Sequence, residues 1–264
     1  MTLIVNTLEG TIDRVAVAIE RIQTFEPEEG YYVAFSGGKD SQVVLDLVAQ
    51  SGAKFDAHMN LTTVDPPELL RFVREMYGGV HIADPEVALD HPGTSMFKLI
   101  QQNGPPTRLH RFCCRSLKEH GGEGRFVVTG VRWQESQRRA KRGMVESCRY
   151  GTGTQYLHPI IDWSADDCWE YLEGRGIEHC SLYDEGQSRI GCIMCPMGGR
   201  RQMEAHALRW PKTASMYRRA MSKWFTRKYP CGDARWKDGA SVYDWWISGK
   251  STKAGDPQLF PMDN

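Results

Sequence analysis

The sequence predicts an α/β fold of the doubly wound type: a mostly parallel sheet with a helical C-terminal extension. An apolar run, Tyr31–Phe35, leads directly into a glycine-rich turn and then into a helical pattern. Further short apolar runs alternate with segments of helical periodicity, which is typical of parallel strands joined by helices. Beyond Arg189 the strand signals disappear, and 200–228 has a helical pattern. We therefore expect an α/β domain over 1–188 and a mostly helical extension over 189–264 packed on it.

The individual elements follow from periodicity and from capping residues. Apolar residues recur every three or four positions from Leu8 to Ile22, which predicts an amphipathic helix before the sheet. Ser164, followed three residues later by Asp167, predicts the start of another helix, which glycines at 174 and 176 would end. The other expected strands are 31–35, 55–62, 80–83 and 126–129, and the other expected helices are 41–49, 66–76 and 94–102.

Composition excludes several classes of protein. With 264 residues, of which 41% are hydrophobic and 25% are charged, the chain is neither disordered nor fibrous. The sequence has no stretch of eighteen apolar residues and no leader-like N-terminus, so we expect a cytoplasmic protein without a membrane partner. Eight cysteines in that reducing compartment favour metal or redox chemistry over a disulfide framework.

The net charge of zero hides an uneven distribution of charged residues. Residues 105–150 contain 11 Lys and Arg against 4 Asp and Glu, and residues 189–228 contain 10 against 1. If these two basic segments converged, they would form a positive surface suited to a phosphate-rich ligand or to nucleic acid. The alternative for each segment is an ordinary solvated helical face.

The turn after the first sheet strand has the composition of a phosphate-binding loop. The hexapeptide Ser36–Ser41 (SGGKDS) lies between a strand and a helix, at the sheet edge where doubly wound folds bind ligands. Two glycines allow successive N–H groups to face one concavity, and the helix N-terminus adds positive potential there. An ordinary glycine-rich turn is the alternative. The expected phosphate ligands are Ser36, Gly37, Gly38, Lys39 and Ser41, with Asp40 holding Mg²⁺ or fixing the loop.

Four of the eight cysteines form two close pairs, Cys113-Cys114 and Cys192-x-x-Cys195. Thiolates are soft ligands, so two such pairs are suited to a shared zinc ion or iron–sulfur cluster. Adjacent cysteines diverge in direction, which fits the separate irons of a cuboidal cluster better than one small tetrahedral ion. A redox-active CxxC pair and unliganded cysteines remain alternatives. Cys168, among apolar helix residues, is expected to be a small core residue.

The loop and its neighbours resemble the phosphoadenosine phosphosulfate (PAPS) reductase family of the adenine-nucleotide α-hydrolase superfamily, which has a HUP-type fold. The matching segments are Ser36–Ser41, 62–68 (TTVDPPE), 130–136 (GVRWQES) and 158–163 (HPIIDW). The resemblance implies an adenine nucleotide whose phosphates occupy the loop and whose pocket is lined by later strand ends. On that basis the further nucleotide-binding residues are Thr63, Asp65, Gly130, Arg132 and Glu135.

The cysteine pattern is similar to that of assimilatory adenylylsulfate reductases and of DndC-like enzymes of DNA phosphorothioation. That similarity implies a [4Fe–4S] cluster on four ligands, with zinc as the alternative metal. The implied ligands are Cys113, Cys114, Cys192 and Cys195.

The chain departs from sulfonucleotide reductases at its C-terminal part. Their nucleophilic cysteine lies in a Glu-Cys-Gly-Leu-His motif, of which only Cys231-Gly232 is present here. We therefore expect an ATP pyrophosphatase that cleaves between the α- and β-phosphates, with Lys39, Asp40 and Arg132 as catalytic residues and Mg²⁺ on the pyrophosphate. Sulfur transfer or nucleic-acid modification is the expected context. The alternatives are a thiol-dependent PAPS or adenylylsulfate reductase using Cys231, and a non-catalytic nucleotide- or nucleic-acid-binding accessory subunit.

Overall fold

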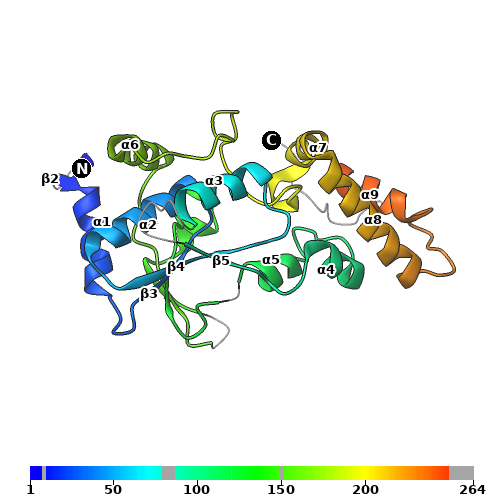
Figure 1. Ribbon diagram of the computed structural model, residues 1–264, viewed down its shortest axis with the longest axis horizontal. Helices are drawn as coiled ribbons and strands as arrows, with labels where there is room; N and C mark the ends of the chain where they lie inside the picture. The colour runs from blue at the N-terminus through cyan, green and yellow to red at the C-terminus, as the bar shows by residue number, and fades with distance from the viewer. Residues whose placement is uncertain (8–9, 79–86, 120, 149–151, 250–264) are drawn as a thin grey trace. The chain divides into compact units, whose positions relative to one another are not determined.

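The computed structural model describes residues 1–264 except 8–9, 79–86, 120, 149–151 and 250–264 (Figure 1). The chain divides into two compact units whose segments interleave along the sequence. The first unit comprises Met1–Asn60, Pro67–Asp90 and Gly121–Ile190, and the second comprises Leu61–Pro66, His91–His120 and Gly191–Asn264. The expected division after residue 188 lies close to the last of these boundaries. Two earlier segments, however, belong with the C-terminal one.

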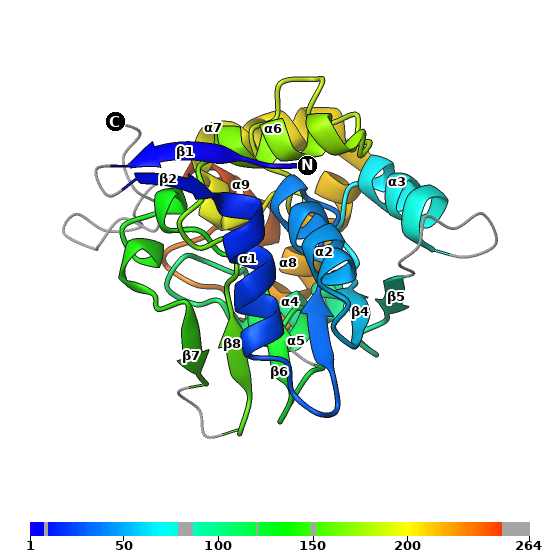
Figure 2. The same cartoon turned by 90° about the vertical axis from the view of Figure 1, so that its left-hand side faces the viewer.

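A six-stranded sheet forms the centre of the first unit, in the order β5-β4-β3-β6-β8-β7. All neighbouring strands are parallel except β7 and β8, which are antiparallel. Figure 2 shows helices α1 and α2 lying across one face of this sheet. The predicted α/β class, with its mostly parallel sheet, is confirmed. The strands are β3 (Tyr31–Ala34), β4 (Phe55–Asn60), β5 (Val87–Asp90), β6 (Phe126–Val128), β7 (Val145–Ser147) and β8 (Gln155–Leu157).

The helices of the first unit begin and end at the residues that their capping chemistry favours. The Asp13 side chain accepts the Val15 N–H at the start of α1, and Ser164 and Asp167 form the predicted capping box of α6. Gly176, in the left-handed conformation, ends α6, whereas Gly174 is an interior residue of this helix. The helices are α1 (Arg14–Thr24), α2 (Lys39–Ser51), α3 (Pro67–Tyr77) and α6 (Ala165–Arg175), with the 3₁₀ turns η1 (Trp133–Glu135) and η2 (Arg139–Lys141).

The N-terminal helix is shorter than expected. Residues 4–7 and 10–13 form an antiparallel hairpin, so Ile12 belongs to a strand and the helix begins only at Arg14. Ile12 is flanked by Thr11 and by the capping residue Asp13, and β-branched residues next to an N-cap favour the extended conformation. Leu8 and the predicted strand 80–83 lie outside the described residues. The hairpin strands are β1 (Ile4–Thr7) and β2 (Gly10–Asp13).

The second unit is helical and has its own apolar core. Tyr217, Met221 and Trp246 are almost completely buried. The segment expected as one helical stretch consists of two helices, because Pro211 lacks an amide donor and fits only the first turn of a new helix. Figure 1 shows α8 and α9 side by side, and the sequence pattern did not predict α9. The helices are α4 (Met96–Asn103), α5 (Phe112–Leu117), α7 (Gly199–Arg209), α8 (Pro211–Lys228) and α9 (Gly239–Ser248), with a 3₁₀ turn, η3 (Pro196–Gly198).

No described helix is both long and apolar enough to cross a lipid bilayer.

Candidate functional site

The Ser36–Ser41 loop joins the carboxyl end of β3 to the start of α2. Gly37 has a φ of +69°, and a Cβ built there would lie 2.6 Å from Cγ2 of Val73 and 2.7 Å from Cδ1 of Leu69. Both the backbone conformation and the close approach of α3 therefore require glycine at this position. This tight turn brings the amides of the loop to the N-terminus of α2, as the sequence predicts.

Hydrogen bonds between the two serines hold the loop closed. The Ser41 hydroxyl accepts the Ser36 N–H over 3.2 Å, lies 3.1 Å from the Ser36 hydroxyl, and donates to the Gly38 carbonyl over 2.8 Å. Within the described part of the chain, the amides of Gly37 and Gly38 donate no hydrogen bond. Unpaired amides at a helix N-terminus form a ready binding site for an anion.

A buried cation of the loop and a second buried cation outside it share one carboxylate. The Lys39 ammonium lies 2.9 Å from Asp40 Oδ1, and Arg132 Nε donates to the same oxygen over 2.9 Å. Lys39 is 5% exposed and Arg132 is 4% exposed. Burial alone would raise the pKa of Asp40, but the charges of Lys39 and Arg132 outweigh it and hold this pKa below its usual value. The structure thus brings together the three predicted catalytic residues as one ionised cluster.

Gly130 and Glu135 support this cluster from the end of β6. A Cβ at Gly130 would lie 2.8 Å from the Asp40 carbonyl oxygen, so glycine permits the strand end to approach α2. The Glu135 carboxylate accepts the Arg132 N–H over 2.9 Å and pairs with Arg139. Both residues therefore fix the backbone around Arg132, and a direct contact of either with nucleotide stays a prediction.

Thr63 and Asp65 belong to the second unit. Asp65 accepts the N–H and the hydroxyl of Thr62, each over 2.7 Å, in a tight turn that gives Thr63 a φ of +63°. The Thr63 hydroxyl accepts the Met96 N–H over 3.0 Å, at the start of α4. These bonds give both residues a structural role, and their predicted contact with nucleotide remains a prediction.

All four predicted metal-ligand cysteines lie in the second unit. Cys113 and Cys114 are on α5, while Cys192 and Cys195 flank a turn in which the Cys195 N–H donates to the Cys192 carbonyl over 3.3 Å. The Cys113 thiol donates to Cys114 and, with Arg111 3.6 Å away, lowers the pKa of Cys114. The hydrogen bond to Cys114 and burial raise the pKa of Cys113, and Cys195 and Cys192 are close enough to raise it further.

This donor set fits a thiolate-bound metal centre in its chemistry. A cysteine thiol must lose its proton to bind metal, and nearby cations favour the resulting thiolate. The Lys118 ammonium has a raised pKa, chiefly because of the Cys192 thiolate, so its positive charge offsets part of the thiolate charge. Among the described residues, however, no three His, Cys, Asp or Glu side chains are already arranged around a common ligand position.

Three contacts near these sites were not predicted from the sequence. The Tyr183 hydroxyl accepts the Lys39 N–H, and the Lys118 ammonium lies close enough to Cys192 for the thiolate to raise its pKa. The fully buried Cys168 thiol lies close enough to Asp40 to help lower the pKa of that carboxyl. Cys168 is therefore the predicted core residue and, in addition, a neighbour of the Asp40 carboxylate. Its position four residues after Ser164 on α6 was visible in the sequence, but nothing there indicated that α6 faces the loop.

The other residues that the sequence singles out lie away from the loop cluster or are exposed. Cys231, the nucleophile of the alternative reductase function, is exposed in the second unit. Arg142 pairs with Glu146 rather than with the loop cluster. Arg138 and Lys141 are exposed, in agreement with the alternative of a solvated face for this stretch.

Several known proteins are similar to this chain. An uncharacterized protein of Methanocaldococcus jannaschii is 27% identical over 252 residues, covering 90% of this chain and 51% of that protein. A second one from the same organism is 28% identical, covering 72% and 46% respectively. The chain thus spans about half the length of these two relatives. Adenosine 5'-phosphosulfate reductase 2 of Bacillus subtilis is 24% identical over 220 residues, covering 75% of this chain and 85% of that enzyme.

The fold comparison agrees with the sequence comparison. The crystal structure of a PAPS reductase from Candida auris, a phosphate complex, superposes with a TM-score of 0.50 at 17% identity. It covers 67% of this chain and 89% of that structure, and at this identity it supports the fold alone. The sequence profile described as the phosphoadenosine phosphosulfate reductase domain matches residues 30–198, which include the loop, Arg132 and all four paired cysteines. The chain therefore belongs to the phosphoadenosine phosphosulfate reductase family.

Proposed function

We propose that this protein binds ATP with Mg²⁺ at the Ser36–Ser41 loop and cleaves the bond between the α- and β-phosphates. One observation carries the proposal: the unpaired amides of Gly37 and Gly38 lie next to two buried cations, Lys39 and Arg132. A buried pair of cations with one carboxylate suits a ligand that brings several negative charges.

The reaction has a simple balance of bonds. A nucleophilic atom of the acceptor forms a bond to the α-phosphorus while the bond from that phosphorus to the bridging oxygen breaks. AMP remains on the acceptor, and pyrophosphate leaves with Mg²⁺. The loop amides and the Ser36 and Ser41 hydroxyls hold the leaving pyrophosphate, while Lys39 and Arg132 stabilise its developing charge. When the phosphates pair with Lys39 and Arg132, the Asp40 carboxylate leaves these cations and binds the hydrated Mg²⁺.

We further propose that Cys113, Cys114, Cys192 and Cys195 hold a [4Fe–4S] cluster. The mixture of soft thiolates with the cations of Lys118 and Arg111 supports it, and zinc is the alternative metal. Such a cluster would supply iron for sulfur chemistry or a structural cross-link within the second unit. Sulfur transfer or nucleic-acid modification is the context we propose for the reaction.

The test is to incubate the purified protein with ATP and Mg²⁺ and to separate the nucleotides by chromatography. Without another acceptor, water takes its place, so we expect free AMP and pyrophosphate from the wild type and neither from Lys39→Ala, with ATP affinity measured in parallel by calorimetry. The exposed Lys54 provides the control, since Lys54→Ala removes a cation of the same type outside the cluster. Undiminished product from Lys39→Ala, or AMP without pyrophosphate, would refute the site or the reaction.

A second function is favoured by the adenosine 5'-phosphosulfate reductases among the relatives and by the exposed Cys231. In this alternative a thiolate attacks the sulfur of a sulfonucleotide, the nucleotide leaves, and reduced thioredoxin releases sulfite from the resulting thiosulfonate. It predicts sulfite release from the wild type and none from Cys231→Ser. Sulfite at the wild-type rate from this variant would exclude Cys231 as the nucleophile.

A further inference from the structure

One face of α8 carries a row of cations in the second unit. Lys212, Arg219 and Lys223 are spaced seven and four residues apart, so they lie on the same side of the helix. All three are exposed, while the opposite side, which includes Tyr217, Met221 and Phe225, is buried. At about 1.5 Å of rise per residue the row extends for roughly 16 Å. We call these three residues the α8 cation row.

The charges of this row are not neutralised by neighbouring side chains. α8 contains no Asp or Glu. Within the part of the chain that the structure describes, none of the three row residues forms an ion pair or a side-chain hydrogen bond, whereas the next cation, Arg218, lies 2.8 Å from Asp244. A row of unpaired cations attracts a polyanion, and its contacts with phosphates release counterions.

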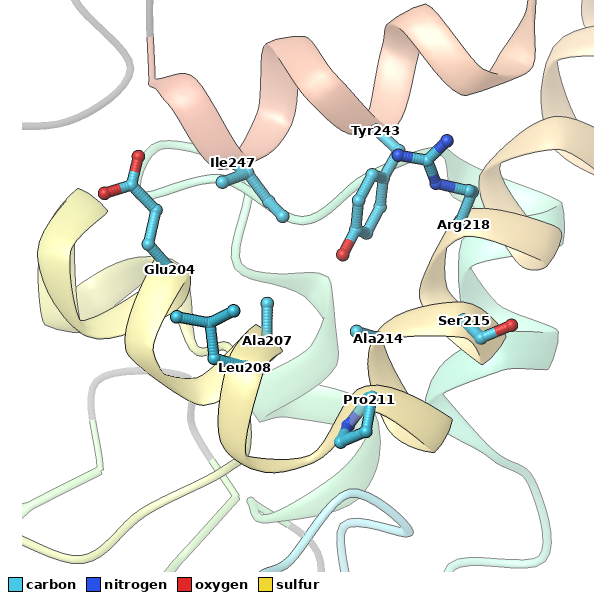
Figure 3. Close-up of a pocket in the computed structure, with 9 residues that line it drawn as sticks. All are labelled: Glu204, Ala207, Leu208, Pro211, Ala214, Ser215, Arg218, Tyr243 and Ile247. Atoms are coloured by element: carbon cyan, nitrogen blue, oxygen red, sulfur yellow. The ribbon is translucent and has the colours of Figure 1, made fainter.

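A cavity of about 650 Å³ opens beside the row, between α7, α8 and α9. Figure 3 shows Ile247 and the Tyr243 ring directed toward the space above Ala214 and Pro211. Its wall on α7 includes Leu208, which is 84% exposed. Its polar members are Glu204, Ser215 and Arg218. The cavity is therefore an apolar slot with a few polar groups at its edge.

The slot and the cation row adjoin on α8. Ser215 lines the slot and precedes Arg219 by one helical turn, so the two side chains are neighbours on the helix surface. The Arg218 guanidinium lies 4.7 Å from the centre of the Tyr243 ring and forms one side of the slot. An arginine plane supported by an aromatic ring offers a surface on which a nucleobase can stack.

We propose that this surface binds single-stranded nucleic acid, with phosphates along the α8 cation row and one unstacked base in the slot. Single strands are bound by cations that follow the backbone together with planar groups on which bases stack, and both are present here within one helix turn of each other. A duplex keeps its bases stacked and would leave the slot empty. An acidic peptide without aromatic residues, such as poly-glutamate, could satisfy the cations but would bring no flat ring to the slot. This proposal goes beyond ATP cleavage and does not depend on it.

The test measures the fluorescence anisotropy of labelled 15-nucleotide oligo(dT) and oligo(U) on the full chain over a series of salt concentrations. A duplex of the same length and poly-glutamate serve as competitors. We expect the labelled single strands to bind, the duplex and poly-glutamate to displace them only weakly, and the affinity to fall as salt rises. Equal binding of duplex and single strand, or tighter binding of poly-glutamate, would overturn the proposal, and the latter would identify an acidic protein partner.

Two matched charge reversals separate the row from general electrostatics. Arg219→Glu/Lys223→Glu changes two exposed neighbours on α8, and Arg71→Glu/Arg74→Glu changes two exposed neighbours on α3. The first variant should bind at least about tenfold more weakly and lower the slope of log affinity against log salt by about 1.4, since each phosphate contact contributes about 0.7. The second should bind within about twofold of the wild type. Equal losses in both variants would show that no specific surface exists.

Filling the slot tests the base separately from the phosphates. Ala207→Phe adds a ring to the slot wall and leaves every charge in place. We expect weaker binding with an unchanged salt slope, and circular dichroism controls for folding. The control is Leu208→Ser, which removes exposed apolar area without filling the slot. Its affinity for the single strand should fall less than that of Ala207→Phe. Wild-type affinity of Ala207→Phe would refute the base-binding slot.

Discussion

The hydroxyl of Tyr183 accepts a hydrogen bond from the backbone N–H of Lys39 over 3.0 Å, at the centre of the proposed phosphate loop. The same hydroxyl faces Gly38, where a Cβ would lie 3.4 Å from it. Burial raises the pKa of Tyr183 to about 12, so the hydroxyl is neutral at physiological pH. The hydroxyl thus accepts the hydrogen bond of an amide N–H that an entering phosphate oxygen would need.

We predict that Tyr183→Phe binds ATP more tightly than the wild type. The phosphate no longer has to displace the hydroxyl, and a net hydrogen bond of about 1 kcal/mol corresponds to about fivefold in affinity. The free enzyme should lose a similar free energy of unfolding, because the Lys39 N–H loses its acceptor. Calorimetric titration with ATP and thermal unfolding without it measure the two effects.

The control for this substitution is Tyr31→Phe. Tyr31 donates to the Ile22 carbonyl over 2.7 Å, away from the loop, so its loss should lower stability without changing ATP affinity. If Tyr183→Phe bound ATP more weakly, the hydroxyl would be a ligand of the bound nucleotide and not its competitor.

Gly37→Ala should destabilise the protein by about 2–4 kcal/mol and abolish ATP binding. The added methyl carbon meets the side chains of Val73 and Leu69 at less than 3 Å, which adds overpacking to the strain of a positive φ. Gly52→Ala is the matched control, because Gly52 has a φ of +74° and a Cβ added there would have no neighbour within 4 Å. It should show the backbone strain alone, about 1 kcal/mol, in a denaturant titration. Equal losses in the two variants would contradict the steric argument.

The sequence predicts the loop well because its determinants are local. Gly37, Gly38 and the adjoining strand and helix lie within one stretch of chain, where composition alone indicates a tight turn. The Tyr183 contact joins residues 144 apart, and no periodicity in the intervening chain indicates it.

The short strands β7 and β8 were missed for a different reason. β7 and β8 have three residues each, too few to show a period of two. Their pairing depends instead on neighbours such as Val128 and Leu157, which are brought together by the sheet. The helix α9 was missed because its start depends on the Asp238 and Ser241 capping box within a glycine- and tryptophan-rich stretch that lacks a clear polar face.

The paired cysteines give a prediction for metal content. Cys114→Ser, purified without oxygen, should lose most of its iron and its absorption band at about 400 nm, since a hydroxyl is a poor substitute for a soft thiolate. Cys231→Ser should retain both, because that exposed cysteine lacks a partner at ligand spacing in the sequence. Metal analysis of the two variants side by side is the measurement. One equivalent of zinc and no iron in the wild type would contradict the cluster and identify the site as a zinc site.

His158 gives a prediction for the dependence of stability on pH. It is 0% exposed, and burial, together with the charge of Arg142, lowers its pKa from 6.5 to about 4. Its Nδ1 lies 2.7 Å from the hydroxyl of Thr129, the residue after β6, and this hydrogen bond stabilises the neutral ring. In the unfolded chain the ring takes up a proton below about pH 6.5, while the folded protein does not until about pH 4.

The contribution of neutral His158 to stability is therefore fully present above pH 6.5 and is lost as the pH falls toward 4. A difference of about 2.5 pKa units corresponds to roughly 3 kcal/mol in the free energy of unfolding. His158→Gln, which keeps an amide in place of the ring but does not titrate, should lose less stability than the wild type across this interval. Urea titrations of both proteins at pH 7, 5.5 and 4.5 measure the difference, and parallel curves would show that the folded protein accommodates a charged His158.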